Sequence, residues 1–120
     1  MKIGEFSKRV GLPVSTLHFY ERKGLISPER NRSGHRDYCE HDIAWVEFIE
    51  RLKDTGMPLA QIKDYADLRA LGDSTLGERM GMLVAHREDV VKAIAHWQDN
   101  LDHLDRKIEH YEIELSRQEA

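Results

Sequence analysis

The chain has 120 residues, with 18 Lys and Arg against 22 Asp and Glu, which gives a formal net charge of −4 at pH 7. This length fits one compact domain, or a small domain with an appendage. No apolar run approaches the roughly 20 residues that span a bilayer, and the N-terminus lacks the apolar core of a signal peptide, so we expect a cytoplasmic protein that does not enter a membrane. The single cysteine, Cys39, excludes an internal disulfide and a zinc site built from cysteines.

The charge is distributed unevenly along the chain. Residues 1–38 carry eight Lys and Arg against four Asp and Glu, a net charge of +4, and the remaining residues carry a net charge of −8. A basic head on an acidic body indicates contact with a polyanion through one end only. Ordinary surface charge would give a similar imbalance, so the motifs in the basic part must decide between the two interpretations.

Two short helices come first in the chain. The spacing of Ile3, Phe6 and Val10 predicts a helix over residues 3–10. A Gly–Leu–Pro turn follows, and a second helix is expected over residues 15–23, where the next glycine ends it. Two short helices joined by a tight turn form a helix-turn-helix pattern, which is weak evidence alone because two-helix hairpins are common.

A basic segment without helix signals follows the second helix. Residues 28–38 read PERNRSGHRDY, with a Ser–Gly pair flanked by arginines, and predict a β-turn or hairpin. A helix-turn-helix followed by a basic hairpin is a winged helix, in which the wing adds a second contact with DNA phosphates or the minor groove.

The rest of the chain is predicted to be helical. Apolar spacing indicates helices over residues 40–54 and from Pro58 onward, then a break near Gly72, then a long terminal helix. We therefore expect a mainly α fold, in which a winged helix-turn-helix head with a small β wing precedes a long coiled-coil dimerisation helix. The expected boundaries are 1–72 for the DNA-binding domain, 73–82 for the linker and the start of the arm, and 83–118 for the coiled-coil helix.

The terminal helix carries a continuous heptad pattern. Apolar or aromatic residues recur in alternating steps of four and three, with positions a and d filled by Val90, Ile94, Trp97, Leu101, Leu104, Ile108, Tyr111 and Leu115. A lone helix would leave this seam in water, so we expect a homodimer. The alternative is that the seam packs back onto its own head. The sequence alone leaves parallel and antiparallel pairing open.

The second helix concentrates the groups that suit DNA. The Ser15 and Thr16 hydroxyls can bond phosphates or base edges, and the side chains of Arg22 and Lys23 close the helix with positive charge. Between them, Leu17 and Tyr20 are expected to be buried. Glu21 would repel phosphate, so we expect it to hold an arginine. The candidate DNA contacts are Ser15, Thr16, His18, Phe19, Arg22 and Lys23, together with Arg32 and Arg36 of the wing and, from the resemblance given below, Tyr38; Arg36 is also the expected partner of Glu21.

The remaining reactive side chains predict no catalysis and no metal site. His96, His103 and His110 recur every seventh residue, about 10 Å apart along a helix, so one helix cannot bring two of them to one ion. A solvated surface is the preferred interpretation, with a site between two chains as the alternative. No phosphate loop, nucleophile elbow or HExxH motif is present, so we expect neither an enzyme nor a cofactor. Cys39 is either a redox or electrophile sensor or a small, partly buried side chain at a helix start.

The first 70 residues resemble the MerR-type transcription regulators. The segment IGEFSKRVGLPVSTLHFYERKGLISPERNRSGHRDY carries a variant of the family's T-L-R-Y-Y-E-x-x-G-L-I-x-P block and its R-x-x-x-G-x-R-x-Y wing, and a D-I helix and a G-M-x-L-x-x-I helix follow. The long terminal helix is similar to the family's antiparallel dimerisation arm. The resemblance implies a symmetric dimer on promoter DNA whose −35 and −10 elements are spaced too far apart. On a signal the dimer bends and untwists that DNA for RNA polymerase.

The sequence departs from the family pattern at the expected DNA surface and at the expected sensor. His18 and Phe19 stand where the family usually has Arg and Tyr, so a permanent cation and a hydroxyl are lost at the expected DNA surface. The chain most resembles the branch that responds to aldehydes or nitrosative stress, but Arg51 occupies the place of that branch's sensor cysteine. A second function class stays open: a coiled-coil adaptor whose winged head binds protein instead of DNA.

Overall fold

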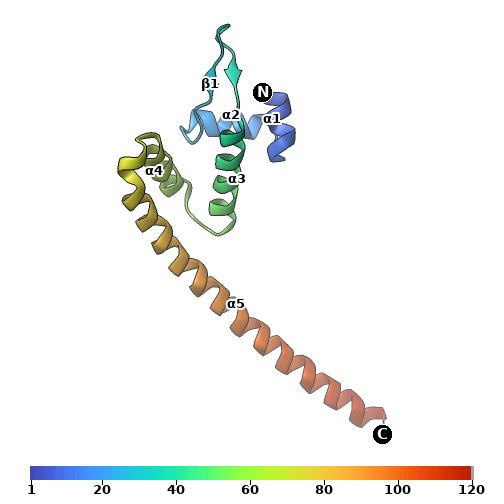
Figure 1. Cartoon of the computed structure of the whole chain (residues 1–120). Coiled ribbons are helices and arrows are strands. Elements are labelled where there is room, and N and C mark those ends of the chain that lie inside the picture. The colour runs from blue at the N-terminus through green and yellow to red at the C-terminus, as the bar shows by residue number, and fades with distance from the viewer. Residues whose placement is uncertain (120) are drawn as a thin grey trace. The chain divides into compact units, whose positions relative to one another are not determined.

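The computed structural model describes residues 1–119 (Figure 1). The chain is mainly α-helical with one small antiparallel sheet, which confirms the predicted fold class. Its elements follow in the order α1 (Ile3–Val10), α2 (Val14–Arg22), β1 (Glu29–Arg30), β2 (Arg36–Asp37), α3 (Glu40–Asp54), α4 (Leu59–Ala70), the 3₁₀ turn η1 (Asp73–Thr75) and α5 (Leu76–Glu119).

A tight turn joins α1 to α2. Gly11 ends α1 with a φ of 73°, in the left-handed region that glycine adopts without a Cβ penalty, and its N–H donates to the Ser7 carbonyl at 2.9 Å. Pro13 then precedes α2 at a φ of −60°, which suits the start of a helix. This geometry confirms the predicted helix-turn-helix.

The wing is a two-stranded hairpin, with Glu29 opposite Asp37 and Arg30 opposite Arg36 (Figure 1). Asn31 closes its tip, because its side-chain oxygen accepts the N–H groups of Ser33 at 2.9 Å and His35 at 3.0 Å. These side-chain hydrogen bonds stabilise the turn, because strands of two residues form few backbone hydrogen bonds with each other. The hairpin therefore holds its basic residues on a defined turn.

The core joins all four short helices of the head. Each of them contributes at least one completely buried side chain: Phe6 from α1, Leu17 from α2, Val46 and Ile49 from α3, and Ile62 from α4. Burying one such side chain stabilises a fold by about 1.5–3 kcal/mol. Helix α2 is thus fixed by packing on its inner side.

The last helix includes most of the segment expected to hold the linker and the start of the arm. α5 starts at Leu76 and is not interrupted by Gly77 or Gly81. The cost of each glycine, about 1 kcal/mol, is offset by contacts with the head. The Arg79 guanidinium donates to the Thr75 hydroxyl at 3.0 Å and to the Gly72 carbonyl at 3.1 Å.

Two compact units divide the chain, and the first is longer than the predicted DNA-binding domain. It covers Met1–Leu83, because Met82 and Leu83 at the start of α5 pack against the head core. The rest of α5, from Val84 onward, forms the second unit. Across the described residues, every helix is too short or too polar to cross a membrane.

Candidate nucleic-acid interface

The outer side of α2 carries the polar residues that the sequence selected. Ser15, Arg22 and Lys23 are exposed, while Thr16 and His18 are half-buried. Leu17 and Tyr20 lie on the opposite side of the helix, and each is at most 1 % exposed. Helical periodicity therefore separates a packed face from a basic, hydroxyl-bearing face.

Phe19 occupies a mixed position on this helix. It is half-buried and packs against the edge of the core, and its ring lies 6.2 Å from that of Tyr20. The Lys23 ammonium lies over the exposed side of the ring at 5.7 Å from its centre. Phe19 is thus only partly accessible on this face, and its ring lies beside a cation.

An ion pair connects the recognition helix to the wing. The Arg36 guanidinium donates from Nε to Glu21 Oε2 at 2.6 Å, which confirms the partner expected from the sequence. The two side chains are 37 % and 24 % exposed, so solvent screens the pair only in part. Glu21 therefore places a wing arginine next to α2.

Glu21→Gln is expected to loosen this arrangement and to strengthen non-specific DNA binding. The change removes a carboxylate from the basic face and frees Arg36 for a phosphate, so the salt dependence of binding should steepen by about one unit of log–log slope per freed cation. The ratio of specific to non-specific affinity should fall. Fluorescence anisotropy on promoter and random duplexes across a salt series measures both. Glu114→Gln, which removes an exposed carboxylate from α5, is the control and should change neither quantity.

Two open depressions adjoin the ion pair. One, of about 530 Å³, lies between the start of α1, α2 and the wing and is lined by Met1, Lys2, Ile3, His18, Asn31, His35, Arg36 and Asp37. A second, of about 450 Å³, is lined by His18, Glu21, Arg22 and Arg36. His18 and Arg36 therefore border both. The sequence did not indicate Lys2, Asn31 and His35 as part of this surface. No local pattern shows that the start of the chain and the tip of the wing lie together.

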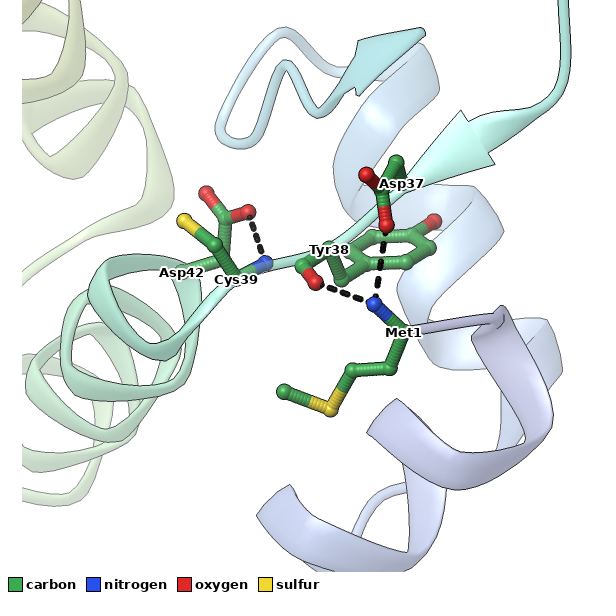
Figure 2. A network of polar contacts seen from close by, with 5 residues as sticks. All are labelled: Met1, Asp37, Tyr38, Cys39 and Asp42. Atoms are coloured by element: carbon green, nitrogen blue, oxygen red, sulfur yellow. Dashed lines mark hydrogen bonds and ion pairs between the residues drawn. The ribbon is translucent and has the colours of Figure 1, made fainter. Parts of the chain in front are cut away.

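Tyr38 does not lie on this surface. Its side chain is 2 % exposed and stacks on Phe6, with the ring centres 4.2 Å apart (Figure 2 shows the ring). Burial raises the pKa of its hydroxyl, which has no hydrogen-bond partner among the described residues. This placement counts against the DNA contact that the family resemblance implied for Tyr38. The residue is instead part of the head core, at the point where the wing returns to it.

A network at the start of the chain ties α1 to the wing (Figure 2). The Met1 ammonium donates to Asp37 Oδ1 at 2.9 Å and to the Tyr38 carbonyl at 2.6 Å, and the Tyr38 N–H donates to the Met1 carbonyl at 2.9 Å. The hydrogen bond to Asp37 raises the pKa of the Met1 amino group. Asp37 at the end of β2 and Tyr38 after it are therefore held to Met1, just before α1, by three hydrogen bonds.

Cys39 lies at the N-cap of α3, next to this network (Figure 2). Its N–H donates to Asp42 Oδ2 at 2.9 Å, and its thiol is exposed. The alternative placed Cys39 at a helix start, as found, but its expectation of a partly buried side chain is wrong. Arg51, in the place of the family branch's sensor cysteine, is exposed on the same helix.

Tyr20 links the recognition helix to α3 through two charged groups. Its hydroxyl donates to Glu50 Oε1 and accepts from Lys53 Nζ, the latter at 2.8 Å. Burial is the main cause that raises the pKa of Tyr20, followed by the hydrogen bond to Glu50. The same hydroxyl raises the pKa of Lys53, because it accepts a hydrogen bond from the Lys53 ammonium. α2 therefore meets α3 through a bonded polar chain as well as through packing.

Removing the two buried hydroxyls is expected to have opposite effects on stability. Tyr20→Phe breaks two hydrogen bonds to charged groups and should lower the free energy of unfolding by about 1–2 kcal/mol. Tyr38→Phe removes a buried hydroxyl without a partner and should raise it by about 1 kcal/mol. Urea unfolding followed by circular dichroism measures both, and each variant is the other's control because each change removes one oxygen. Equal losses in both variants would contradict the pairing described for these residues.

The geometry defines a class of protein: a winged helix-turn-helix with a basic recognition helix, a basic wing and a long terminal helix. Among residues 1–119, no three His, Cys, Asp or Glu side chains are placed to hold a metal ion. The known proteins that this chain resembles agree on the class. The family described as MerR HTH family regulatory protein matches residues 1–68, and the family described as MerR, DNA binding matches residues 43–107. The chain belongs to the MerR family of DNA-binding transcription regulators.

Individual relatives support this assignment. The transcriptional regulator AdhR of Bacillus subtilis is 39 % identical over 93 residues, which cover 77 % of this chain and 66 % of AdhR. A MerR family regulator from Listeria monocytogenes has a crystal structure that matches with a TM-score of 0.86, at 34 % identity over 93 % of this chain and 86 % of that one. HiNmlR, a MerR family regulator lacking the sensor domain and bound to promoter DNA, matches with a TM-score of 0.81, at 30 % identity over 92 % and 89 % of the two chains. These relatives are regulators and not enzymes.

Proposed function

We propose that this regulator binds a near-palindromic promoter as a homodimer in the cytoplasm and distorts the DNA between the −35 and −10 elements in response to a signal, with RNA polymerase as its functional partner. The single observation that carries the proposal is the exposed basic face of α2 beside the wing, because it presents cations and hydroxyls in the order that a winged helix needs. The DNA-bound state of HiNmlR adds support from a relative.

Dimerisation is supported by the state of the heptad seam. Seven of its side chains, all but the half-buried Val90, are between 49 % and 73 % exposed in the single chain. A row of large apolar side chains left in water marks an interaction surface. A second copy would cover the seam and place two recognition helices on two half-sites.

The switch can act through the free energy that it costs to distort DNA. Bending a site of 20–30 base pairs costs on the order of 1–6 kcal/mol, which a dimer can supply through added phosphate contacts. The exposed thiol of Cys39 is the candidate sensor, since it is the only thiol in the sequence and lies at the wing–α3 junction. A distortion induced by an aldehyde or a thiol oxidant and absent in Cys39→Ser would support that role. A response unchanged in Cys39→Ser would assign the signal to a ligand bound without a covalent bond.

The basic face is tested by footprinting and gel shift on the DNA upstream of the gene that encodes the chain. Arg22→Ala with Lys23→Ala removes four cations per dimer, so the log–log salt slope should fall by about 3–4 units. Arg117→Ala, at the exposed end of α5, is the matched control and should leave the slope unchanged. A wild-type chain that gives no footprint at low salt would overturn the proposal and favour the adaptor that binds protein.

A further inference from the structure

The two open depressions on the head adjoin and form one trough. The larger, of about 530 Å³, lies between the start of the chain, α2 and the wing, and these three segments can be followed in Figure 1. The smaller, of about 450 Å³, reaches Arg22 at the end of α2. His18 and Arg36 line both depressions. The trough therefore extends from Arg22 past the wing to Lys2, the residue before α1.

Each end of this trough carries a cation without an ion pair. Lys2 lines the larger depression and Arg22 lines the smaller, and both side chains are exposed. Neither forms an ion pair within residues 1–119. Between these two ends, the charge of Arg36 is offset by Glu21. The trough is therefore suited to bind negative charge at two separate points, because hollows lined by one sign of charge concentrate the opposite sign.

The wall of the larger depression combines apolar and polar groups. Met1 and Ile3 contribute partly exposed apolar side chains, and His35 contributes an exposed ring from the wing. The backbone N–H of His35 donates to the Asn31 side chain at 3.0 Å, which fixes this part of the wing. One carboxylate, Asp37, is among the lining residues, and the Met1 ammonium neutralises it at 2.9 Å (Figure 2). A ligand with an apolar part next to a negative group fits such a wall.

The backbone of one DNA strand has this chemistry, because every nucleotide carries a negative phosphate beside a deoxyribose with an apolar carbon face. We propose that the trough receives the sugar–phosphate backbone of one strand, with Lys2 and Arg22 bound to two different phosphates of that strand. The contact of Lys2 rests on the proposed promoter binding and extends it, since Lys2 lies outside both the helix-turn-helix and the wing.

Lys2 acts on the position of the head and not on the choice of bases. Contacts with phosphates fix how a protein lies on the duplex but carry no sequence information of their own. A single contact leaves the head free to rotate about it, whereas two contacts on one strand define a direction. Lys2 and Arg22 lie at the two ends of the trough, so together they limit the rotation of the head on its half-site.

A double-mutant cycle between protein and DNA tests this contact. A neutral methylphosphonate replaces one phosphate at a time along each strand of a promoter half-site, and fluorescence anisotropy measures the affinity of the full chain. At one position the replacement should weaken binding of the wild type on the order of 5-fold and should leave binding of Lys2→Gln nearly unchanged, because the partner of that phosphate is already missing. Arg22→Gln should show the same coupling to a different phosphate of the same strand.

The salt dependence of binding gives a second measurement. Lys2→Gln removes two cations per dimer, so the log–log salt slope should fall by about 2 units, while the ratio of specific to non-specific affinity should stay at the wild-type value. Lys92→Gln changes an exposed lysine on α5, outside the trough, and is the matched control. It should keep the wild-type slope and the wild-type response to every methylphosphonate.

The outcomes separate this inference from the proposed function. Coupling of Lys2 to no phosphate, to the phosphate that couples to Arg22, or to a phosphate of the opposite strand would overturn the proposed path of the backbone. An unchanged salt slope in Lys2→Gln would overturn the contact as well. A wild-type chain that binds no promoter would instead refute the DNA binding on which the contact rests.

Discussion

Leu101→Glu combined with Ile108→Glu is expected to convert the regulator to a monomer and to lower promoter affinity by at least about 100-fold. Both side chains belong to the exposed seam, at 49 % and 55 % exposure, and a carboxylate in either place would be desolvated on pairing. Two linked half-site contacts bind far more tightly than one, by about 10²–10⁴-fold. Sedimentation measures the assembly and fluorescence anisotropy measures the affinity.

Ile113→Glu provides the control for this change. Ile113 is also exposed, at 46 %, and lies on the same helix, but it falls outside positions a and d of the heptad. Both assembly and DNA affinity should therefore stay at the wild-type level. A double variant that remains dimeric, or a control that dissociates, would show that the seam is not the contact surface.

Trp45→Ala is expected to lower the free energy of unfolding of the head by about 3–5 kcal/mol. The side chain is 6 % exposed and stacks on Tyr65 with ring centres 5.7 Å apart, while the Arg69 guanidinium lies 4.5 Å from the ring centre. Its Nε1 donates to the Leu25 carbonyl at 2.8 Å, so the change also leaves a buried acceptor unpaired. Chemical denaturation followed by near-ultraviolet circular dichroism measures the loss.

Trp97→Ala is the matched control, because the sequence has two tryptophans and Trp97 is 73 % exposed on α5. Its removal should leave the packing of the head unchanged and weaken self-association. Trp45→Phe keeps a ring without the N–H and should lose less than Trp45→Ala. If Trp45→Ala and Trp97→Ala have the same free energy of unfolding, the stability of the head core does not depend on Trp45.

Features set by short-range pattern were predictable from the sequence. Spacing of apolar residues and breaker residues located α1 and α3 to the residue, because helix periodicity and capping act within a few positions. The pairing of Glu21 with Arg36 also followed from chemistry, since a carboxylate on a basic surface needs a cation. The DNA contacts other than Tyr38 and the dimer seam remain predictions, and most of the residues concerned are at least partly exposed.

Features set by packing between distant segments were not predictable. The inclusion of the start of α5 in the head unit depends on Met82 and Leu83 contacting the head core, and α5 stays helical through Gly77 and Gly81. The burial of Tyr38 depends on its stacking with Phe6, more than 30 positions away in the chain. Neither contact leaves a local signal, because propensity and spacing report only on neighbours in sequence.

The bonded chain from Tyr20 to Glu50 and Lys53 has a mechanical consequence. Since α2 is locked to α3 by packing and by charged hydrogen bonds, the recognition helix cannot tilt within its own head without breaking both. Each head is then expected to move as one rigid body. In the proposed homodimer, a bend in the promoter would therefore come from rotating one whole head against the other, and not from tilting α2 within its head.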